Sequence, residues 1–274
     1  MKTIIACTDF SREAENATHY AASMAKENAF KMILFNLQTV SIHALNAQAS
    51  ADFFYTQTLK NQKKLKDKVM ELRRVYAIEV EYHLASGNFI EELENCMQIH
   101  SCDFLVMGME EKTLEQKLLG NHVTRAFHRI KKPILIVPSH IEYTGIRKIL
   151  FAYDTHRSMT WSAMNDIYYF INEFNAEVEV FNVSESLEDF AEVIQDTDLN
   201  SGYDLDDIRY RFKMIQSIEV IKAIEEEIRL TNPDLLTMVP YRYSLVESLF
   251  HRSKTAIMAY KNKIPLLSIP LNID

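Results

Sequence analysis

The chain has 274 residues, of which 47% are hydrophobic and 25% are charged, a balance typical of globular proteins and a length sufficient for two cores. Its formal net charge of −8 argues against a general affinity for nucleic acid, because phosphate backbones require a concentrated positive surface. No apolar run is long enough to span a membrane, and the stretch MKTIIACTDF is too short for a secretory signal, so we expect a cytoplasmic protein.

The first half alternates strands and helices. Alanine and methionine recur at helical spacing after the first apolar run, and a long stretch rich in Lys and Arg follows the second. We expect strands at 2–7, 31–37, 79–84, 103–107 and 133–137, and helices at 11–28, 51–77, 89–100 and 120–130.

The second half repeats this alternation. Strands are expected near 148–153, 177–183, 209–215, 234–238 and 265–269, and helices near 158–174, 218–230 and 253–261. Short, continuously apolar strands that alternate with helices indicate a parallel sheet with helices on both faces. The sequence therefore predicts an α/β fold built from two five-stranded parallel sheets.

Four sequence blocks recur in the same order in the two halves. KTIIACTD (2–9) matches RKILFAYD (147–154), MILFNLQ (32–38) matches VEVFNVS (178–184), DFLVMGME (103–110) matches DLLTMVPY (234–241), and KKPILIVP (131–138) matches NKIPLLSIP (262–270). Ordered similarity of this kind indicates two homologous domains. We place them at residues 1–142 and 143–274.

Three cysteines, Cys7, Cys96 and Cys102, are too few and too scattered for a disulfide framework. Cys96 and Cys102 form no CxxC pair, and the histidines form no HExxH motif. The sequence therefore predicts no metal site, and reduced core thiols are the favoured interpretation.

The opening TIIACTDFSREAENATHYA resembles the start of a universal stress protein, and FLVMG, LLGN and KKPILIVP resemble later parts of that family's signature. The resemblance covers the chain as two tandem copies. It implies Rossmann-like domains of the adenine nucleotide alpha hydrolase-like kind, each with a five-stranded parallel sheet. Some members of the family bind ATP through a loop with three spaced glycines followed by Ser or Thr, and others bind none.

The first copy departs from that loop. Gly108 and Gly120 match the outer glycines, but Glu111 stands at the middle one and Asn121 replaces the Ser or Thr. Carboxylates near a triphosphate are unfavourable unless a metal ion bridges them. The resemblance therefore implies a weak ATP or AMP site in the first domain, or none. Its expected residues are Thr8, Asp9, Leu37, Met107, Gly108, Gly120, Asn121 and His122. For Asp9, capping of the following helix is an equal alternative to ligand contact.

The second copy has lost the loop, because Val239, Arg242 and Arg252 stand at its three glycine positions, before Ser253. Arginine forks hold phosphate or carboxylate through side chains. Arg242, Arg252 and Ser253 therefore form a candidate anion site, and solvated surface charge is the competing interpretation.

The resemblance favours a stress-response protein without catalytic activity, in which a ligand controls partner binding. The alternative is a ligand-free scaffold, or a sensor of another small anion that uses the basic residues of the second domain. An enzyme such as a slow ATPase is the least favoured option, because the sequence shows no catalytic base and no set of metal ligands near the loop. By resemblance, the two domains pair through Ile134–Val137 and Leu266–Ile269, and a homodimer is a further option. We expect neither nucleic acid nor a membrane as a partner.

Overall fold

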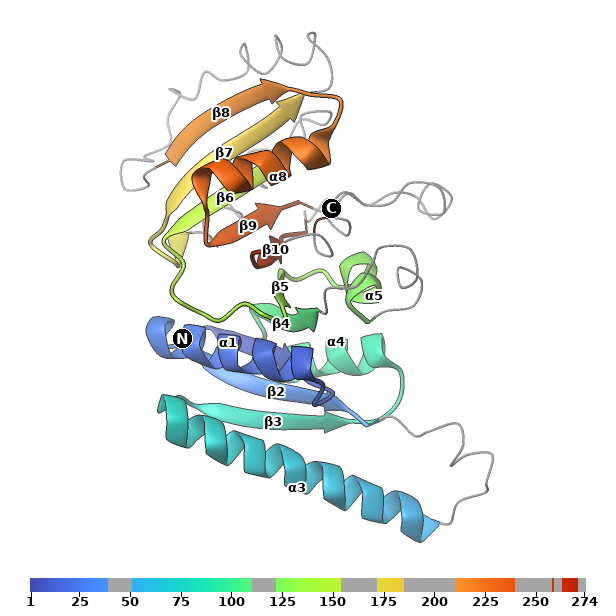
Figure 1. The fold of residues 1–274 in the computed structure, drawn as a ribbon. Coiled ribbons are helices and arrows are strands. Elements are labelled where there is room, and N and C mark those ends of the chain that lie inside the picture. Colours follow the sequence, from blue (N-terminus) through green and yellow to red (C-terminus); the bar gives the residue numbers. More distant parts are fainter. Residues whose placement is uncertain are drawn as a thin grey trace. The chain divides into compact units, whose positions relative to one another are not determined.

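The computed structural model describes residues 1–38, 51–109, 122–153, 172–184, 210–239, 258 and 263–270. The chain divides into two compact units, Met1–Tyr143 and Thr144–Asp274. Each unit combines a parallel sheet with helices, as Figure 1 shows. The predicted α/β fold class with a parallel sheet in each half is confirmed.

The first unit contains five parallel strands in the order β3-β2-β1-β4-β5. The strands are β1 (Thr3–Cys7), β2 (Lys31–Leu37), β3 (Val80–Ala85), β4 (Phe104–Met109) and β5 (Ile134–Pro138). The helices are α1 (Arg12–Asn28), α3 (Ala51–Tyr76), α4 (Phe89–Ile99) and α5 (His122–Arg129). All nine elements lie where the sequence predicts them.

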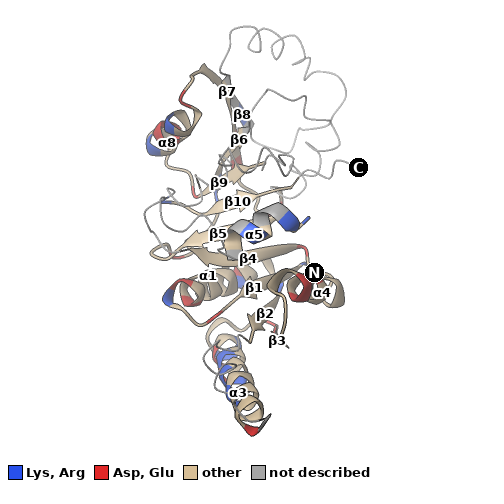
Figure 2. Ribbon diagram, turned by 90° about the vertical axis from the view of Figure 1, so that its right-hand side faces the viewer, with Lys and Arg blue, Asp and Glu red and all other residues tan. Residues whose placement is uncertain are grey.

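Helix α1 shows how local sequence sets these elements. Ser11 is its N-cap, and the Ser11 side chain accepts a hydrogen bond from the amide of Ala14. The helix ends at Ala29, which takes a left-handed conformation with φ 54°. Its buried face is rich in alanine, which lets the helix lie close to the sheet. Helices α1 and α4 cover opposite faces of this sheet (Figure 2).

The second unit has the same strand order, β8-β7-β6-β9-β10, and all its pairs are parallel. Its strands are β6 (Lys148–Tyr153), β7 (Glu177–Ser184), β8 (Tyr210–Gln216), β9 (Leu235–Met238) and β10 (Leu266–Ser268), and its helix α8 spans Val220–Thr231. The other two predicted helices, near 158–174 and 253–261, lie almost entirely outside the described residues.

The repeat extends to individual hydrogen bonds. In the first unit Asp103 accepts a bond from the Thr3 amide at 2.7 Å and returns one from its own amide to the Thr3 carbonyl at 2.9 Å. In the second unit Asp234 accepts from the amides of Arg147 and Lys148 at 2.8 and 2.9 Å, and its amide donates to the Lys148 carbonyl at 2.8 Å. An aspartate thus fastens the start of the central strand in each unit.

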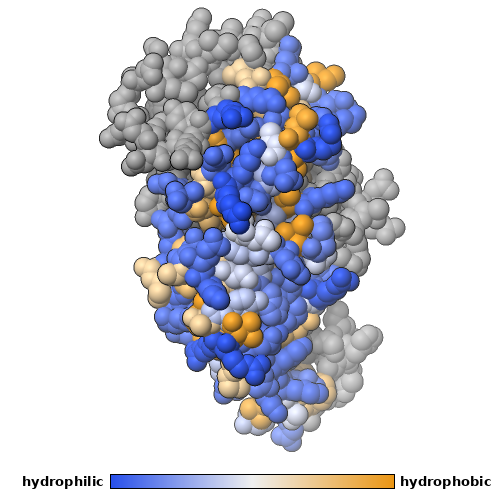
Figure 3. All heavy atoms as spheres, turned by 60° about the vertical axis from the view of Figure 1, so that its left-hand side comes forward, coloured by the Kyte–Doolittle hydropathy of each residue, from blue (hydrophilic) through white to orange (hydrophobic). Residues whose placement is uncertain are grey.

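Most of the outer surface is polar. Figure 3 shows hydrophobic residues scattered among hydrophilic ones on the face in view. Helix α3 exposes apolar residues such as Tyr55 and Met70 between its many lysines. In the described part of the chain, every helix is too short or too polar to cross a membrane.

Replacing Asp103 or Asp234 by Ala should destabilise its own unit by about 1–3 kcal/mol, because strand amides then lose a charged acceptor. The Asp→Asn variants are matched controls, because an amide oxygen still accepts these hydrogen bonds. Their loss of unfolding free energy should be clearly smaller than that of the Ala variants. Urea unfolding of the four variants measures the difference. Equal losses for Ala and Asn would show that these carboxylates do not act as acceptors.

Candidate functional site

A cavity of about 440 Å³ opens at the carboxyl ends of β1, β2 and β4 in the first unit. This is the edge at which parallel α/β sheets bind ligands, and the volume falls in the range of small-molecule sites. Parts of the four helices that the structure describes in this unit complete its walls. The lining residues are Cys7, Thr8, Asp9, Phe10, Ser11, Ala14, Phe35, Asn36, Leu37, Gln57, Asn61, Phe89, Met107, Gly108 and Val123.

Five residues singled out from the sequence line this cavity: Thr8, Asp9, Leu37, Met107 and Gly108. Five others lie outside the described residues: Gly120 and Asn121 of the loop, and Arg242, Arg252 and Ser253 of the second half. His122 is the first residue of α5, but its side chain is not described. The structure therefore brings together the predicted site residues that lie on the strands of the sheet or at their ends.

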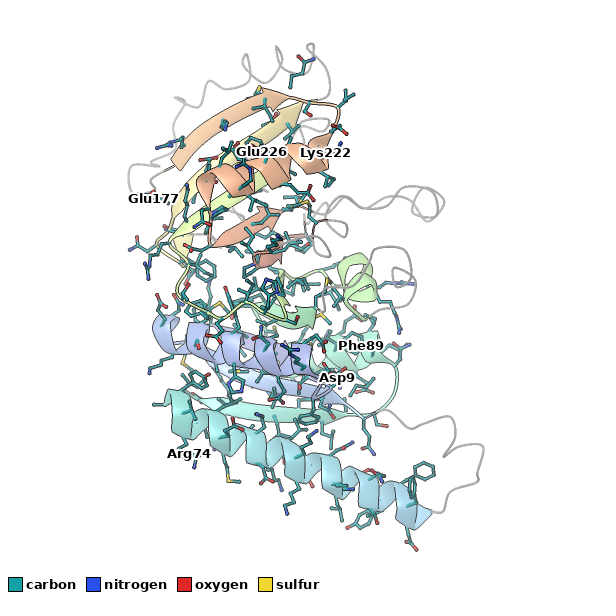
Figure 4. All side chains as sticks on the ribbon, viewed as in Figure 1. Asp9, Arg74, Phe89, Glu177, Lys222 and Glu226 are labelled. Atoms are coloured by element: carbon teal, nitrogen blue, oxygen red, sulfur yellow. The ribbon has the colours of Figure 1, made fainter. Side chains whose placement is uncertain are left out.

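The junction between β1 and α1 is held by local hydrogen bonds. The Phe10 amide donates to Thr8 Oγ1 at 3.0 Å, and the Ser11 amide donates to Asp9 Oδ1 at 2.9 Å. Phe10 takes a φ of 63°, which is unusual for a bulky residue. One oxygen of Asp9 thus serves the turn. Asp9 also lines the cavity, as does Phe89 at the start of α4 (Figure 4).

Asn36 lies beside Leu37 at the strand end that the sequence places at the ligand edge, but it was not among the expected site residues. It is buried, and its Nδ2 donates to the Thr8 carbonyl at 2.7 Å, which joins the ends of β1 and β2. Within the described residues its Oδ1 is buried and accepts no hydrogen bond. A buried acceptor without a donor is unfavourable, so a ligand N–H would satisfy it. The available signal was the repeat itself, which places Asn182 at the matching position.

Helix α3 contributes the polar wall. Gln57 and Asn61 are four residues apart and share one helical face with Lys64. The Lys64 ammonium lies 3.8 Å from the ring centre of Phe10. Phe89 and Val123 add apolar contact from α4 and α5. The sequence alone did not identify these residues, because only the packing of three helices brings them to one place.

Gly108 has a packing role. A Cβ at this position would lie 2.2 Å from the Glu13 carbonyl oxygen and 2.9 Å from the Ala14 amide nitrogen. Backbone cannot move aside as a side chain can, so any larger residue would push the first turn of α1 away from β4. The close approach of α1 to the sheet thus explains this glycine without a phosphate.

The electrostatic character of the cavity is weakly negative. Among its described lining residues, Asp9 alone carries a formal charge. Burial raises the pKa of the Cys7 thiol far above its ordinary value, so that thiol is neutral. Burial likewise raises the pKa of Cys96 and of Cys102 to about 12. The walls therefore suit an aromatic ring and hydroxyl or amino groups better than an anion.

A buried pair of carboxyl groups distinguishes the second unit. Glu179 of β7 and Glu227 of α8 are 4% and 3% exposed, and one oxygen of each lacks a hydrogen-bond partner in the described part of the chain. Glu227 Oε2 accepts from Lys213 at 2.5 Å. Burial, and then the neighbouring carboxyl of Glu227, raise the pKa of Glu179, while Lys148 and Lys213 oppose the rise. The buried carboxyl of Glu179 therefore favours its protonated form more than an exposed glutamate does.

Comparison with known families identifies the first unit. Residues 1–138 match the model of the universal stress protein family. The chain belongs to the universal stress protein family. Membership and fold support a stress-response role of the type that the sequence suggested. A search of curated protein sequences gives no match.

Solved structures agree on the fold across both units. A universal stress protein from Archaeoglobus fulgidus DSM 4304 aligns with a TM-score of 0.75 and 14% identity, over 98% of each chain. A putative universal stress protein from Pseudomonas aeruginosa aligns with a TM-score of 0.61 and 12% identity, over 98% of this chain and 93% of the other. At such identities the likeness concerns the fold alone.

Replacing Gly108 by Ala should destabilise the first unit by about 1–3 kcal/mol, because the new methyl group meets the α1 backbone. Chemical denaturation of the full chain measures this loss. A Gly108→Ala variant with unchanged stability would contradict the packing role.

Replacing Glu179 by Gln should stabilise the second unit at neutral pH, by an amount on the order of 1 kcal/mol, because an amide cannot ionise when buried. A folded-state pKa above the ordinary 4.5 means that wild-type Glu179 contributes most below pH 4.5. That contribution is lost as pH rises through the folded pKa. The advantage of the Gln variant should therefore grow from pH 4 to pH 8, as followed by urea unfolding.

Glu226→Gln is the matched control, because Glu226 lies on the exposed face of the same helix, where it pairs with Arg229. Its effect on the free energy of unfolding should be small, because an exposed ion pair contributes little. Parallel stability–pH curves for wild type and Glu179→Gln would contradict a raised pKa of Glu179 in the folded protein.

Proposed function

We propose that this protein is a stress-response protein of the universal stress protein type that binds the adenosine part of a nucleotide in the cavity of the first unit. The observation that carries this proposal is the cavity of about 440 Å³ at the ligand-binding edge of the sheet, whose wall combines apolar side chains with the polar groups of Thr8, Asp9, Ser11, Asn36, Gln57 and Asn61. In this proposal, binding of the nucleotide favours the state of this protein that binds a protein partner, and no chemical reaction follows.

Each wall has a role in this proposal. The free oxygen of Asp9 accepts hydrogen bonds from ribose hydroxyls, as the family resemblance implies. The buried Oδ1 of Asn36 accepts from the adenine amino group, which removes the cost of its missing partner. Leu37, Phe89 and Met107 surround the base with apolar contact.

Phosphate groups contribute little in this proposal. The described lining residues carry no cation, and Gly108 is explained by packing against α1. Lys64 lies over Phe10 and is the described lysine best placed to meet a single phosphate. The glutamates of the 110–121 loop add negative charge in sequence next to Gly108 and oppose a triphosphate. AMP and adenosine should therefore bind at least as tightly as ATP.

Calorimetric titration of the full chain with adenosine, AMP and ATP tests the proposal. Leu37→Trp, which places a larger side chain at the cavity wall, should weaken adenosine binding by about tenfold or more, equivalent to at least 1.4 kcal/mol. Leu230→Trp is the matched control, because Leu230 is 59% exposed on α8 of the second unit. That variant should bind adenosine like the wild type.

Four results would overturn parts of the proposal. ATP binding much tighter than adenosine binding would show a working phosphate loop. Absence of any binding at millimolar concentration would favour the ligand-free scaffold. Phosphate release from ATP that one substitution abolishes would indicate an enzyme. Anion binding that is lost on charge reversal of Arg242 and Arg252 but kept in Leu37→Trp would favour a site in the second domain. Pairing of the domains through Ile134–Val137 and Leu266–Ile269 stays a prediction.

A further inference from the structure

Three potential metal ligands meet away from the cavity opening in the first unit. They are His83 of β3, Cys96 of α4 and His100, which caps the C-terminus of α4. One ligand atom from each lies within 4.8 Å of the other two. His83 Nδ1 and His100 Nε2 are 3.3 Å apart. Cys96 is buried and the two histidines are half-buried, so the cluster lies at the margin of the core.

The fold brings these residues together in two steps. Cys96 and His100 are four residues apart, so they share one face of a helix. The helix continues to His100, whose amide donates to the Cys96 carbonyl at 3.1 Å. Strand β3 then places His83 against this face, where the rings of His83 and His100 meet at an angle of 82°. The sequence analysis considered Cys96 together with Cys102 and searched the histidines for an HExxH motif, and neither pattern pointed to the set of His83, Cys96 and His100.

We propose that His83, Cys96 and His100 bind a zinc-type transition metal ion. A tetrahedral zinc site with Zn–N bonds of 2.0–2.1 Å has its nitrogens roughly 3.3–3.4 Å apart. The two imidazole nitrogens already stand at that separation. A small adjustment of the Cys96 side chain brings its sulfur within bonding distance, and the metal displaces the thiol proton.

The type of ligand selects the class of metal. Two imidazole nitrogens and one thiolate suit borderline and soft ions such as Zn²⁺ and copper, and they do not suit Mg²⁺ or Ca²⁺, which prefer oxygen. Three protein ligands leave a fourth position for water, as in other zinc sites that have three. The side chains of His83 and His100 are only partly buried, so an ion can reach them from solvent.

The surroundings of the cluster also fit a metal site. Glu81 Oε2 lies 4.0 Å from His100 Nδ1, the ring nitrogen that faces away from the cluster. This distance is longer than a hydrogen bond; a closer approach on metal binding would let Glu81 accept from the Nδ1–H, as carboxylates that orient ligating imidazoles do. Glu81 is itself held by Lys31 at 2.6 Å. On the other side Phe35 stacks on His83 with ring centres 5.9 Å apart, which limits movement of that ring.

A hydrogen-bonded histidine pair beside an inert core thiol would have the same metal-free geometry, so the test must detect the metal itself. Reduced full-length protein is titrated with Zn²⁺ alone and, separately, with Co²⁺ alone. We expect a site that takes one equivalent of Zn²⁺, raises the melting temperature, and gives a thiolate-to-cobalt charge-transfer band with Co²⁺.

The variants assign the ligands. Cys96→Ala should abolish the charge-transfer band and weaken Zn²⁺ binding by at least about tenfold, and His83→Asn should weaken Zn²⁺ binding to a similar degree. Cys102→Ala is the matched control for a buried free thiol, and His19→Asn is the control for a partly exposed histidine bonded to Tyr76. Both controls should keep the band and the affinity. Glu81→Gln should weaken binding by about 10–100-fold while keeping the band.

Two outcomes would overturn the proposal. The first is absence of a stoichiometric Zn²⁺-induced rise in the melting temperature of the wild type. The second is a Zn²⁺ affinity of His83→Asn equal to that of the wild type. His83 is half-buried on the edge strand β3, so this test remains valid even if Cys96→Ala fails to fold. Neither result bears on adenosine binding, which is measured separately in the cavity.

Discussion

The close contact between the first turn of α1 and β4 organises the first unit. The Glu13 carbonyl lies where a Cβ of residue 108 would stand, so only glycine permits the contact. That contact sets the height of α1 above the sheet and thereby the place of Ser11 and Asp9 at its N-terminus. The cavity follows from it, because the turn between β1 and α1 forms one of its walls.

The cavity wall combines apolar and polar side chains, and Asn36 is one of its polar residues. Asn36 uses its amino group to join β1 and β2, and its oxygen is buried without a donor among the described residues. Such a group is tolerated where a ligand satisfies it. Together with Asp9 and the lack of a cation among the described lining residues, this favours recognition of a base and a sugar over recognition of phosphate.

The two units share a strand order and an aspartate at the start of the central strand, yet they differ in buried polar chemistry. The first unit holds a His–Cys–His cluster beside its cavity wall, where Phe35 contacts both. The second unit holds the carboxyl pair of Glu179 and Glu227 beneath α8. The two units thus share a backbone framework, while their buried polar side chains differ.

Local patterns determined the strands, the helices, the duplication and the family, because burial of a sheet imposes apolar runs and helical spacing on any sequence that forms it. The family resemblance pointed to Thr8, Asp9, Leu37 and Met107, which lie at strand ends that meet at one edge of a parallel sheet. Only the tertiary structure decided the roles of Gly108, Asn36 and the His83 cluster. Their contacts join residues from different elements, and the spacing along the chain does not record which elements will touch.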